Sequence, residues 1–253
     1  MNRIAWITLG SVVAACSSSA TPPTREQYDD TAQAIASTTA TGGSSAGDVA
    51  SMTDSVGLAL GTMPAGFELQ GAGQVHGNRL GVDYSYTVVC KDVAGATLAS
   101  CDHTTNQATV SVAWSGNLHT ANVDATVTRD GMWTITGLQT PTAGFSGDSN
   151  FSIDSTLTSV FRPGVTVTYT FDATAAYDAI QIATQPRQVT AGAATFDVTA
   201  HYRVTGTGSN NVDKSFTVHA EITFHADHTA GLVLDATQHY TLDLTTGVVV
   251  RVS

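Results

Sequence analysis

The side chains best suited to bind a metal ion lie close together near the end of the chain. They are His219, Glu221, His225 and His228. Imidazole nitrogens and carboxylate oxygens are ligands for zinc and copper. Because alternate residues of a β-strand point to the same face, residues 219, 221 and 225 would form a row along one strand. The spacing therefore offers a zinc or copper site. The alternative is an ordinary solvated strand face, since a closed site needs ligands that converge.

The strand that follows can be placed by matching apolar faces. A turn at residues 226–228 would set Ala220 and Ile222 against apolar partners and put Asp235 opposite His219. Such a match specifies the register, because a slip by one residue would move every apolar side chain to the solvent face. We therefore expect a hairpin here, with His219 and Asp235 on neighbouring strands.

Three motifs that commonly mark catalysis are missing from the chain. It contains no His-Glu-x-x-His zinc-protease motif, no Ser-x-x-Lys pair and no glycine-rich phosphate loop. The sequence therefore predicts no catalytic residues and a protein that is not an enzyme. A hydrolase remains an alternative, since side chains distant in sequence can meet in space.

The first sixteen residues have the order of an export signal. Met1–Arg3 is positively charged, residues 4–13 are apolar, and Val13-Ala14-Ala15 stands directly before Cys16. This order resembles the signal peptide of bacterial lipoproteins, in which the cysteine after the small residues is lipidated and becomes the mature N-terminus. The resemblance implies that residues 1–15 are removed and that Cys16 carries acyl chains such as palmitate. The alternative is an ordinary secretory signal cut before a free cysteine.

The residue after Cys16 indicates the membrane to which such a lipoprotein is delivered. In the lipoprotein class that the chain resembles, a serine such as Ser17 is compatible with export to the outer membrane, whereas retention signals use aspartate there. The resemblance therefore implies a lipid-anchored protein of the cell envelope, in the outer membrane, either periplasmic or surface-exposed. The apolar segment itself is shorter than the ~20 residues that a membrane-spanning helix needs.

The remaining cysteines suggest a disulfide. Cys90 and Cys101 form an even pair in an oxidising compartment once Cys16 is lipidated, and we expect them to close the loop between them. The alternative is a reactive thiol or a metal-ligand pair, for which the adjacent Asp102-His103 would have to serve as partner.

The charge balance narrows the class of partner. Charged residues make up 12% of the chain and the formal net charge is -11, with Lys91 and Lys214 as the lysines. An acidic, lysine-poor surface argues against nucleic acid and against polybasic binding to anionic lipid headgroups.

Helical patterns are confined to residues 24–64, after a lipidated cysteine and tether at residues 16–23. Thr24 and Gln27 have the spacing of a capping box, and apolar residues follow at helical intervals. A second helix is predicted from about residue 48 to residue 60. We expect both helices to pack on a sheet or to lie between the sheet and the membrane.

From residue 65 to residue 253 the apolar pattern has a period of two, which is typical of strands with one wet face. This predicts a mainly β fold, with one large antiparallel, curved sheet or barrel-like sandwich of about ten strands. A weak internal repeat raises the alternative of two related halves, and whether the sheet closes is left open. Alternation is clearest in the segments Val82–Val88, Val110–Trp114, Ala121–Val127, Val165–Phe171 and Phe216–Phe224.

Turn chemistry suggests where strands end. Gly116-Asn117 is predicted as a two-residue hairpin turn and Arg129–Gly131 as a three-residue one, because both choices pair apolar with apolar side chains. Residues 230–244 keep one parity, so they form either a single long strand or a hairpin that turns at Thr237–His239.

These observations favour a lipid-anchored envelope protein with a binding or structural role, whose partner is another envelope protein. The alternative is a carrier or sensor for a small apolar ligand, held on the concave face of the sheet beneath the helices, or for a transition metal. The deciding observation is whether the apolar face is filled or leaves a ligand-sized cavity of several hundred Å³ (~300–1,000 Å³).

Overall fold

Two helices precede the sheet. The computed structural model describes residues 22–41, 47–79, 81–119, 121–161, 165–204 and 212–252. The predictions for the signal peptide and for Cys16 lie outside these ranges. Helix α1 spans Arg25–Thr39 and helix α2 spans Asp48–Ala59, which confirms the expected pair of N-terminal helices.

The strands form one antiparallel sheet in which each pairs with the next along the chain. Over these described ranges the sheet has twelve strands, close to the expected ten, and it is open, with β1 and β12 at its edges. The prediction of a mainly β, antiparallel fold is therefore confirmed. The strands are β1 (Phe67–Gly71), β2 (Gln74–Arg79), β3 (Val82–Lys91), β4 (Gln107–His119), β5 (Val123–Thr136), β6 (Thr142–Thr158), β7 (Thr166–Thr184), β8 (Arg187–Val204), β9 (Val212–Phe224), β10 (Thr229–Leu234), β11 (Gln238–Asp243) and β12 (Val249–Arg251).

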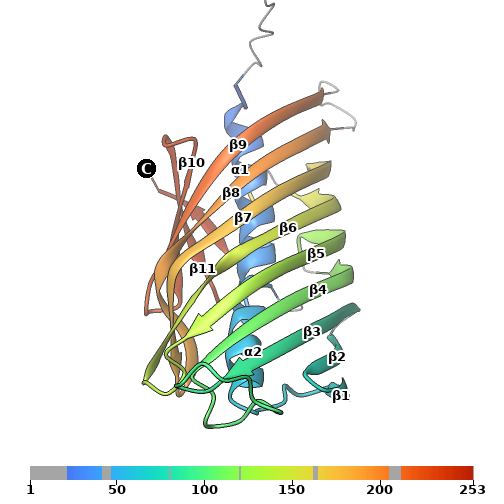
Figure 1. Cartoon of the computed structure of the whole chain (residues 1–253). Coiled ribbons are helices and arrows are strands. Elements are labelled where there is room, and N and C mark those ends of the chain that lie inside the picture. The colour runs from blue at the N-terminus through green and yellow to red at the C-terminus, as the bar shows by residue number, and fades with distance from the viewer. Residues whose placement is uncertain are drawn as a thin grey trace, which may run out of the picture.

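The sheet curls around the helices. Figure 1 shows β3 to β9 running obliquely across α1 and α2, with β10 and β11 to one side. Helix α1 contacts β10, β11 and β12, and α2 contacts β3, β4, β7 and β8. Every residue of α1 from 27 to 39 is buried. A helix buried on all sides must be enclosed, so α1 occupies the inside of the curled sheet.

Local sequence explains where α1 begins. The hydroxyl of Thr24 accepts a hydrogen bond from the Gln27 backbone N–H at 3.4 Å, and the Gln27 side chain accepts one from the Thr24 N–H at 2.8 Å. This reciprocal arrangement is a capping box, which satisfies backbone donors that the first helical turn leaves without partners. The predicted cap is confirmed.

The core lies between the inner face of the sheet and the helices. Strand β3 illustrates the pattern, because Val82, Tyr84, Tyr86 and Val88 are buried while the residues between them are exposed. Trp133 of β5 is fully buried in the same cluster. Alternation with one apolar face is the pattern expected of a sheet that packs on one side only.

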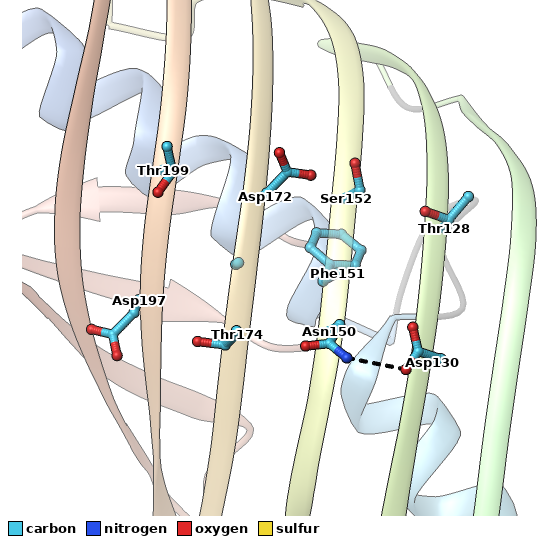
Figure 2. A pocket seen from close by; sticks show the side chains of 10 residues that line it. Thr128, Asp130, Asn150, Phe151, Ser152, Asp172, Thr174, Asp197 and Thr199 are labelled. Atoms are coloured by element: carbon cyan, nitrogen blue, oxygen red, sulfur yellow. Dashed lines mark hydrogen bonds between the residues drawn. The ribbon is translucent and has the colours of Figure 1, made fainter.

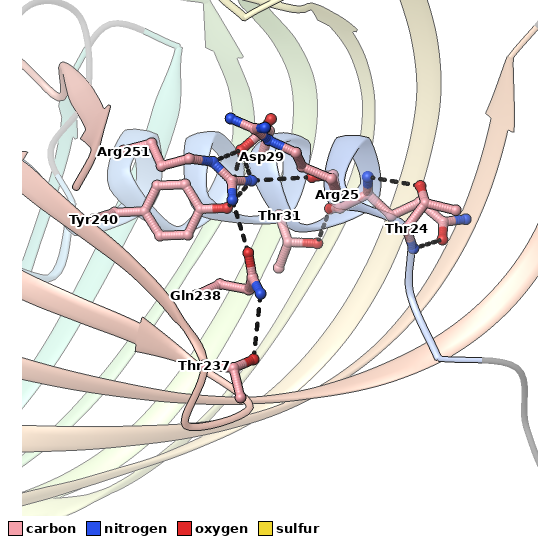
Figure 3. Close-up of polar contacts among 9 residues, drawn as sticks. Thr24, Arg25, Asp29, Thr31, Thr237, Gln238, Tyr240 and Arg251 are labelled. Atoms are coloured by element: carbon pink, nitrogen blue, oxygen red, sulfur yellow. Dashed lines mark hydrogen bonds and ion pairs between the residues drawn. The ribbon is translucent and has the colours of Figure 1, made fainter. Parts of the chain in front are cut away.

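Helix α1 is polar for a buried element, and hydrogen bonds to the sheet explain how it is accommodated. Thr31 shares a hydrogen bond of 2.8 Å with the Tyr169 hydroxyl of β7. Asp29 accepts hydrogen bonds from the Tyr240 hydroxyl, at 3.0 Å, and from Arg251 Nε, at 2.9 Å. Figure 3 shows Asp29, Tyr240 and Arg251 meeting beside the first turns of the helix.

The predicted turns at Gly116-Asn117 and Arg129–Gly131 were wrong. Gly116 lies within β4 and residues 129–131 lie within β5, where Ala113 pairs with Asp130. Glycine inside a strand weakens the strand without ending it, and the apolar parity continues through both segments. The consequence is that Arg129 sits on the inner face of the sheet rather than in a solvent-exposed turn.

Two other sequence predictions concern the hairpin after β9 and the cysteine pair. Residues 230–244 form a hairpin, with the turn at residues 235–237, slightly before the predicted position. Cys90 and Cys101 form a disulfide whose Cα atoms are 5.4 Å apart, which confirms the predicted pairing. The bridge fastens the connection between β3 and β4.

Candidate functional site

The outer face of the sheet carries a row of polar side chains that crosses several strands. Asp130 of β5 pairs with Asn150 of β6, which pairs with Thr174 of β7. Thr174 pairs with Asp197 of β8, and Asp197 pairs with His219 of β9. Cross-strand neighbours on one face have Cβ atoms ~5 Å apart, so these side chains form a continuous ladder.

A second polar row runs beside the first, and the two rows border a hollow. Thr128, Ser152, Asp172 and Thr199 occupy successive strands in register. The hollow between the rows measures about 420 Å³ and opens away from the helices (Figure 2). Its chemistry is that of carboxylate and hydroxyl groups, which accept hydrogen bonds and attract cations.

Inside the hollow, two of the polar side chains contact each other directly. Asn150 Nδ2 donates a hydrogen bond of 3.1 Å to Asp130 Oδ2. Behind them, the buried ring of Phe151 packs against Trp114 at 5.6 Å and Phe171 at 5.4 Å between ring centroids. The polar face therefore rests on an aromatic layer of the core.

His219 ends this row in a carboxylate environment. Its Nδ1 lies 2.7 Å from Asp197 Oδ1, and its Nε2 lies 3.6 Å from Glu221 Oε1. The hydrogen bond with Asp197 is the main cause of a raised pKa of His219, with Glu221 and Asp235 adding to the effect through their charge. Nearby carboxylates favour the charged imidazolium, so the row carries a titratable cation at one end.

Asp235 lies opposite His219, as the sequence predicted. The backbone N–H of Asp235 donates to the His219 carbonyl at 2.8 Å, and the His219 N–H donates to Asp235 Oδ1 at 2.8 Å. The Tyr28 hydroxyl of α1 donates to Asp235 Oδ2 at 2.7 Å, and burial together with this bond raises the pKa of Tyr28 to about 12. Asp235 therefore links α1 to the end of the polar row.

The predicted metal ligands are only partly brought together. His219 and Glu221 are neighbours on the outer face of β9, whereas His225 follows the end of that strand and His228 lies in the next turn. Within the described ranges, no group of three or more His, Cys, Asp or Glu side chains has an arrangement that could hold a metal ion. The geometry thus gives the proposed zinc or copper site no support.

A buried ion pair is the feature that sequence reasoning missed. Arg129 of β5 contacts Asp48 at the start of α2, and both side chains are almost completely inaccessible to solvent. Arg129 Nη2 also donates to Ser149 Oγ at 2.6 Å, and the Tyr177 hydroxyl donates to Asp48 Oδ2 at 2.6 Å. The sequence did contain one indication of this pair, because Arg129 occupies a position of β5 at which the alternating residues are otherwise apolar.

The apolar inner face is occupied by the chain itself. Helices α1 and α2 cover it, and their apolar side chains belong to the same buried cluster as those of the sheet. A hollow of about 140 Å³ lies at the rim, between α2, β8 and the turn that holds His228. That volume is below the ~300–1,000 Å³ of a typical small-molecule site.

Comparison with known proteins gave no relative. No protein-family model, no curated protein and no solved structure matches the chain. Within the described part of the chain, none of the helices combines the length and the apolar character needed to cross a membrane.

Proposed function

We propose that this chain is a lipid-anchored, non-enzymatic protein of the bacterial cell envelope that binds a partner through the outer face of its sheet. The observation that carries the proposal is the division of the sheet into an inner face filled by α1 and α2 and an outer face lined with carboxylates and hydroxyls. Because the apolar side of the sheet is filled, the polar side is the broad face left for recognition.

Charge indicates the kind of partner. The formal net charge is -11, and Asp130, Asp172 and Asp197 border the same hollow. A surface of one sign attracts groups of the opposite sign and accelerates their association. The partner that fits this face is a protein segment rich in lysine and arginine.

The anchor follows from the N-terminal sequence. Val13-Ala14-Ala15-Cys16 supports lipidation of Cys16, and Ser17 supports delivery to the outer membrane. Between Cys16 and the first residue of α1, Arg25, the chain can span at most ~30 Å. The sheet would therefore stay close to the membrane, where it meets other envelope proteins.

The alternative, a carrier for a small apolar ligand, is less well supported. Carriers keep a chamber for the ligand, whereas here the helices place their own side chains against the inner face. The helices are also tied to the sheet by polar contacts, the partly buried pair of Asp29 with Arg251 and the buried pair of Asp48 with Arg129. Opening a chamber would break these contacts and leave charged groups unpaired in the interior.

The anchor is tested by replacing Cys16 with serine. We expect the natural chain to fractionate with membranes and to gain the mass of acyl chains at Cys16, and the C16S variant to lose both properties. An unmodified Cys16, or a C16S variant that stays in the membrane fraction, would contradict the anchor.

The binding face is tested by cross-linking in intact cells. A photo-activatable residue at Thr174, in the centre of the hollow, should give a discrete adduct with one protein. Changing Asp130, Asp172 and Asp197 to asparagine together should abolish that adduct, because the shape is kept while the negative charge is removed. As a control, the same probe at Thr241 of β11 should give no adduct of that mass. An adduct that survives neutralisation would overturn the proposed face.

A further inference from the structure

The last strand is a free sheet edge with apolar side chains facing solvent. Among the residues that the structure describes, strand β12 pairs with β11 alone. Val248, Val250 and Val252 are 56%, 58% and 51% exposed, and their alternation puts them on one face. In Figure 1 the C-terminus lies at the margin of the molecule, beside the hairpin of β10 and β11. Strand β12 (Val249–Arg251) is short and carries Arg251, which limits pairing at an edge, but the exposed stripe of Val248, Val250 and Val252 beside that edge is an apolar surface that a partner could cover.

The backbone of β12 fixes which groups face that partner. The Val252 N–H donates to the His239 carbonyl at 2.9 Å, and the Val248 carbonyl accepts from the Asp243 N–H at 2.8 Å. In an antiparallel ladder, residues that bond to one neighbour alternate with residues that face away from it. Val249 and Arg251 therefore direct their N–H and C=O groups towards the free edge.

We propose that β12 pairs with β12 of a second copy of this chain, antiparallel, about a two-fold axis through Val250. In this register Val249 lies opposite Arg251 of the second copy, so the outward backbone groups of both residues are satisfied. Val250 then lies opposite Val250 of the second copy, and Val248 lies opposite Val252 of the second copy. Every exposed valine of the stripe gains an apolar neighbour, and the sheet continues across the dimer.

A second copy fits this edge better than a lipid surface does. Edge N–H and C=O groups have no partner in a hydrocarbon environment, which costs several kcal/mol (~2–7) for each group. A two-fold register also needs a self-matching pattern, and the stripe Val248-x-Val250-x-Val252 is symmetric about its centre. Isologous pairing of this kind is the commonest form of oligomer.

The edge is held in place by the first turns of α1. Arg251 contacts Asp29 through its guanidinium, and its Nη2 lies 3.3 Å from the Arg25 carbonyl. The start of α1 therefore lies beside the residue next to the two-fold axis. Both tethers would leave the dimer near that axis, so both lipid anchors could reach one membrane.

The stability of the dimer depends on the lipid anchor that is proposed above. A short edge strand buries far less than the ~1,200–2,000 Å² of a standard stable interface, so pairing in dilute solution would be weak. Anchoring both copies in one membrane raises their effective concentration and turns weak contacts into stable association. The dimer would then form in the membrane and dissociate when the anchor is removed.

The test is disulfide formation through Val250→Cys in the full-length protein in a bacterial envelope. Residues opposite each other in a pair of this type have Cα atoms ~4.5 Å apart, which allows a disulfide. Thr241→Cys is the matched control, because it is exposed on the same face one strand further in. Its counterpart in the dimer would be ~14 Å away, beyond the reach of a disulfide.

We expect most of the V250C protein to run as a disulfide-linked dimer and the T241C protein as a monomer. If V250C does not fold, the pair Val248→Cys with Val252→Cys tests the same register. Adding Val250→Lys to that pair should remove the cross-link, because the two lysines would face each other on the axis. Monomeric V250C protein, or equal cross-linking of V250C and T241C, would overturn the proposal.

The anchor and the pairing can be separated in one further variant. C16S with V250C is not anchored, and it should cross-link in solution only when its concentration is raised. If Cys16 proves to carry no lipid but the V250C dimer still forms, the proposed anchor fails and the edge pairing stands. If Cys16 is lipidated and V250C stays monomeric, the pairing fails and the anchor stands.

Discussion

Arg129 of β5 and Asp48 of α2 form an ion pair that joins the middle of the sheet to the first residue of a helix. The guanidinium lies 5.7 Å from the ring centroid of Trp133 and 5.6 Å from that of Tyr177. Burying a charge costs several kcal/mol (order of magnitude) unless it is paired and hydrogen-bonded, and here the two charges pair with each other, although Arg129 Nε has no hydrogen-bond partner among the described residues. The pair therefore fixes α2 at one position on the sheet.

Breaking this pair should strongly destabilise the fold. Arg129→Met leaves the Asp48 carboxylate buried without its cation, and we expect a loss of about 3–5 kcal/mol in the free energy of unfolding. Adding Asp48→Asn should recover at least ~1 kcal/mol, because the uncompensated charge is then gone. Urea denaturation of the single and double variants measures both effects.

A matched arginine controls for the loss of charge in general. Arg203 of β8 is exposed on the outer face, and Arg203→Met should change the free energy of unfolding by less than ~0.5 kcal/mol. If the R129M and R203M variants lose equal stability, or if Asp48→Asn rescues nothing, the ion pair does not have the structural role assigned to it.

The disulfide should make a moderate contribution to stability. Cys90 and Cys101 are 11 residues apart. Closing a loop of that size lowers the entropy of the unfolded chain and stabilises the folded state by about 2–4 kcal/mol. Changing both cysteines to alanine should lower the free energy of unfolding by that amount, and reducing the natural protein should give a similar value. A loss below ~1 kcal/mol in both experiments would contradict this assignment.

His219 should titrate above its ordinary range because of Asp197. Since its pKa is raised in the folded state, its interactions stabilise the fold fully below the unfolded pKa of 6.5, and this contribution disappears as the pH rises through the folded pKa. Asp197→Asn should lower the pKa of His219 and remove stability at pH values below the raised pKa of the folded protein, with no effect above it. A histidine titration followed by NMR measures the shift.

Asp172→Asn is the control for that titration. Asp172 borders the same hollow, but His219 is bonded to Asp197 and not to Asp172. The D172N variant should therefore leave the pKa of His219 close to that of the natural protein. Equal shifts in the D197N and D172N variants would mean that the overall charge of the face, rather than the specific hydrogen bond, sets the pKa.

Much of the fold could be predicted because local and tertiary preferences agree. The capping residues Thr24 and Gln27 place the start of α1 correctly, and alternation identifies the inner face of β3 and β9. The register of His219 with Asp235 followed from matching one apolar face, because any slip would have exposed that face. The exposed row of β9 was likewise predicted by parity alone.

The features that the sequence did not predict depend on the length of the strands and on their order in the sheet. Gly116 and Gly131 resemble turn residues, yet tertiary pairing carries β4 and β5 through them. Once Arg129 was assigned to a turn, its pairing with Asp48 could not be foreseen. The outer hollow was also missed, since it is formed by residues of β5 to β8 that only the order of strands brings together.

A glycine in β6 should tolerate no side chain. Gly147 has φ +144°, and a Cβ added there would lie directly against the Met132 carbonyl oxygen and 2.9 Å from Trp133 Cα. Backbone atoms cannot move aside as a flexible side chain can, so Gly147→Ala should cost at least ~1–3 kcal/mol of unfolding free energy. Gly231→Ala of β10 is the control, because its nearest atom, His225 Nε2, would lie at an ordinary 3.8 Å. Thermal unfolding should show a lower Tm for G147A and little change for G231A. A G147A protein as stable as the natural one would show that β6 and β5 do not approach each other as closely as described.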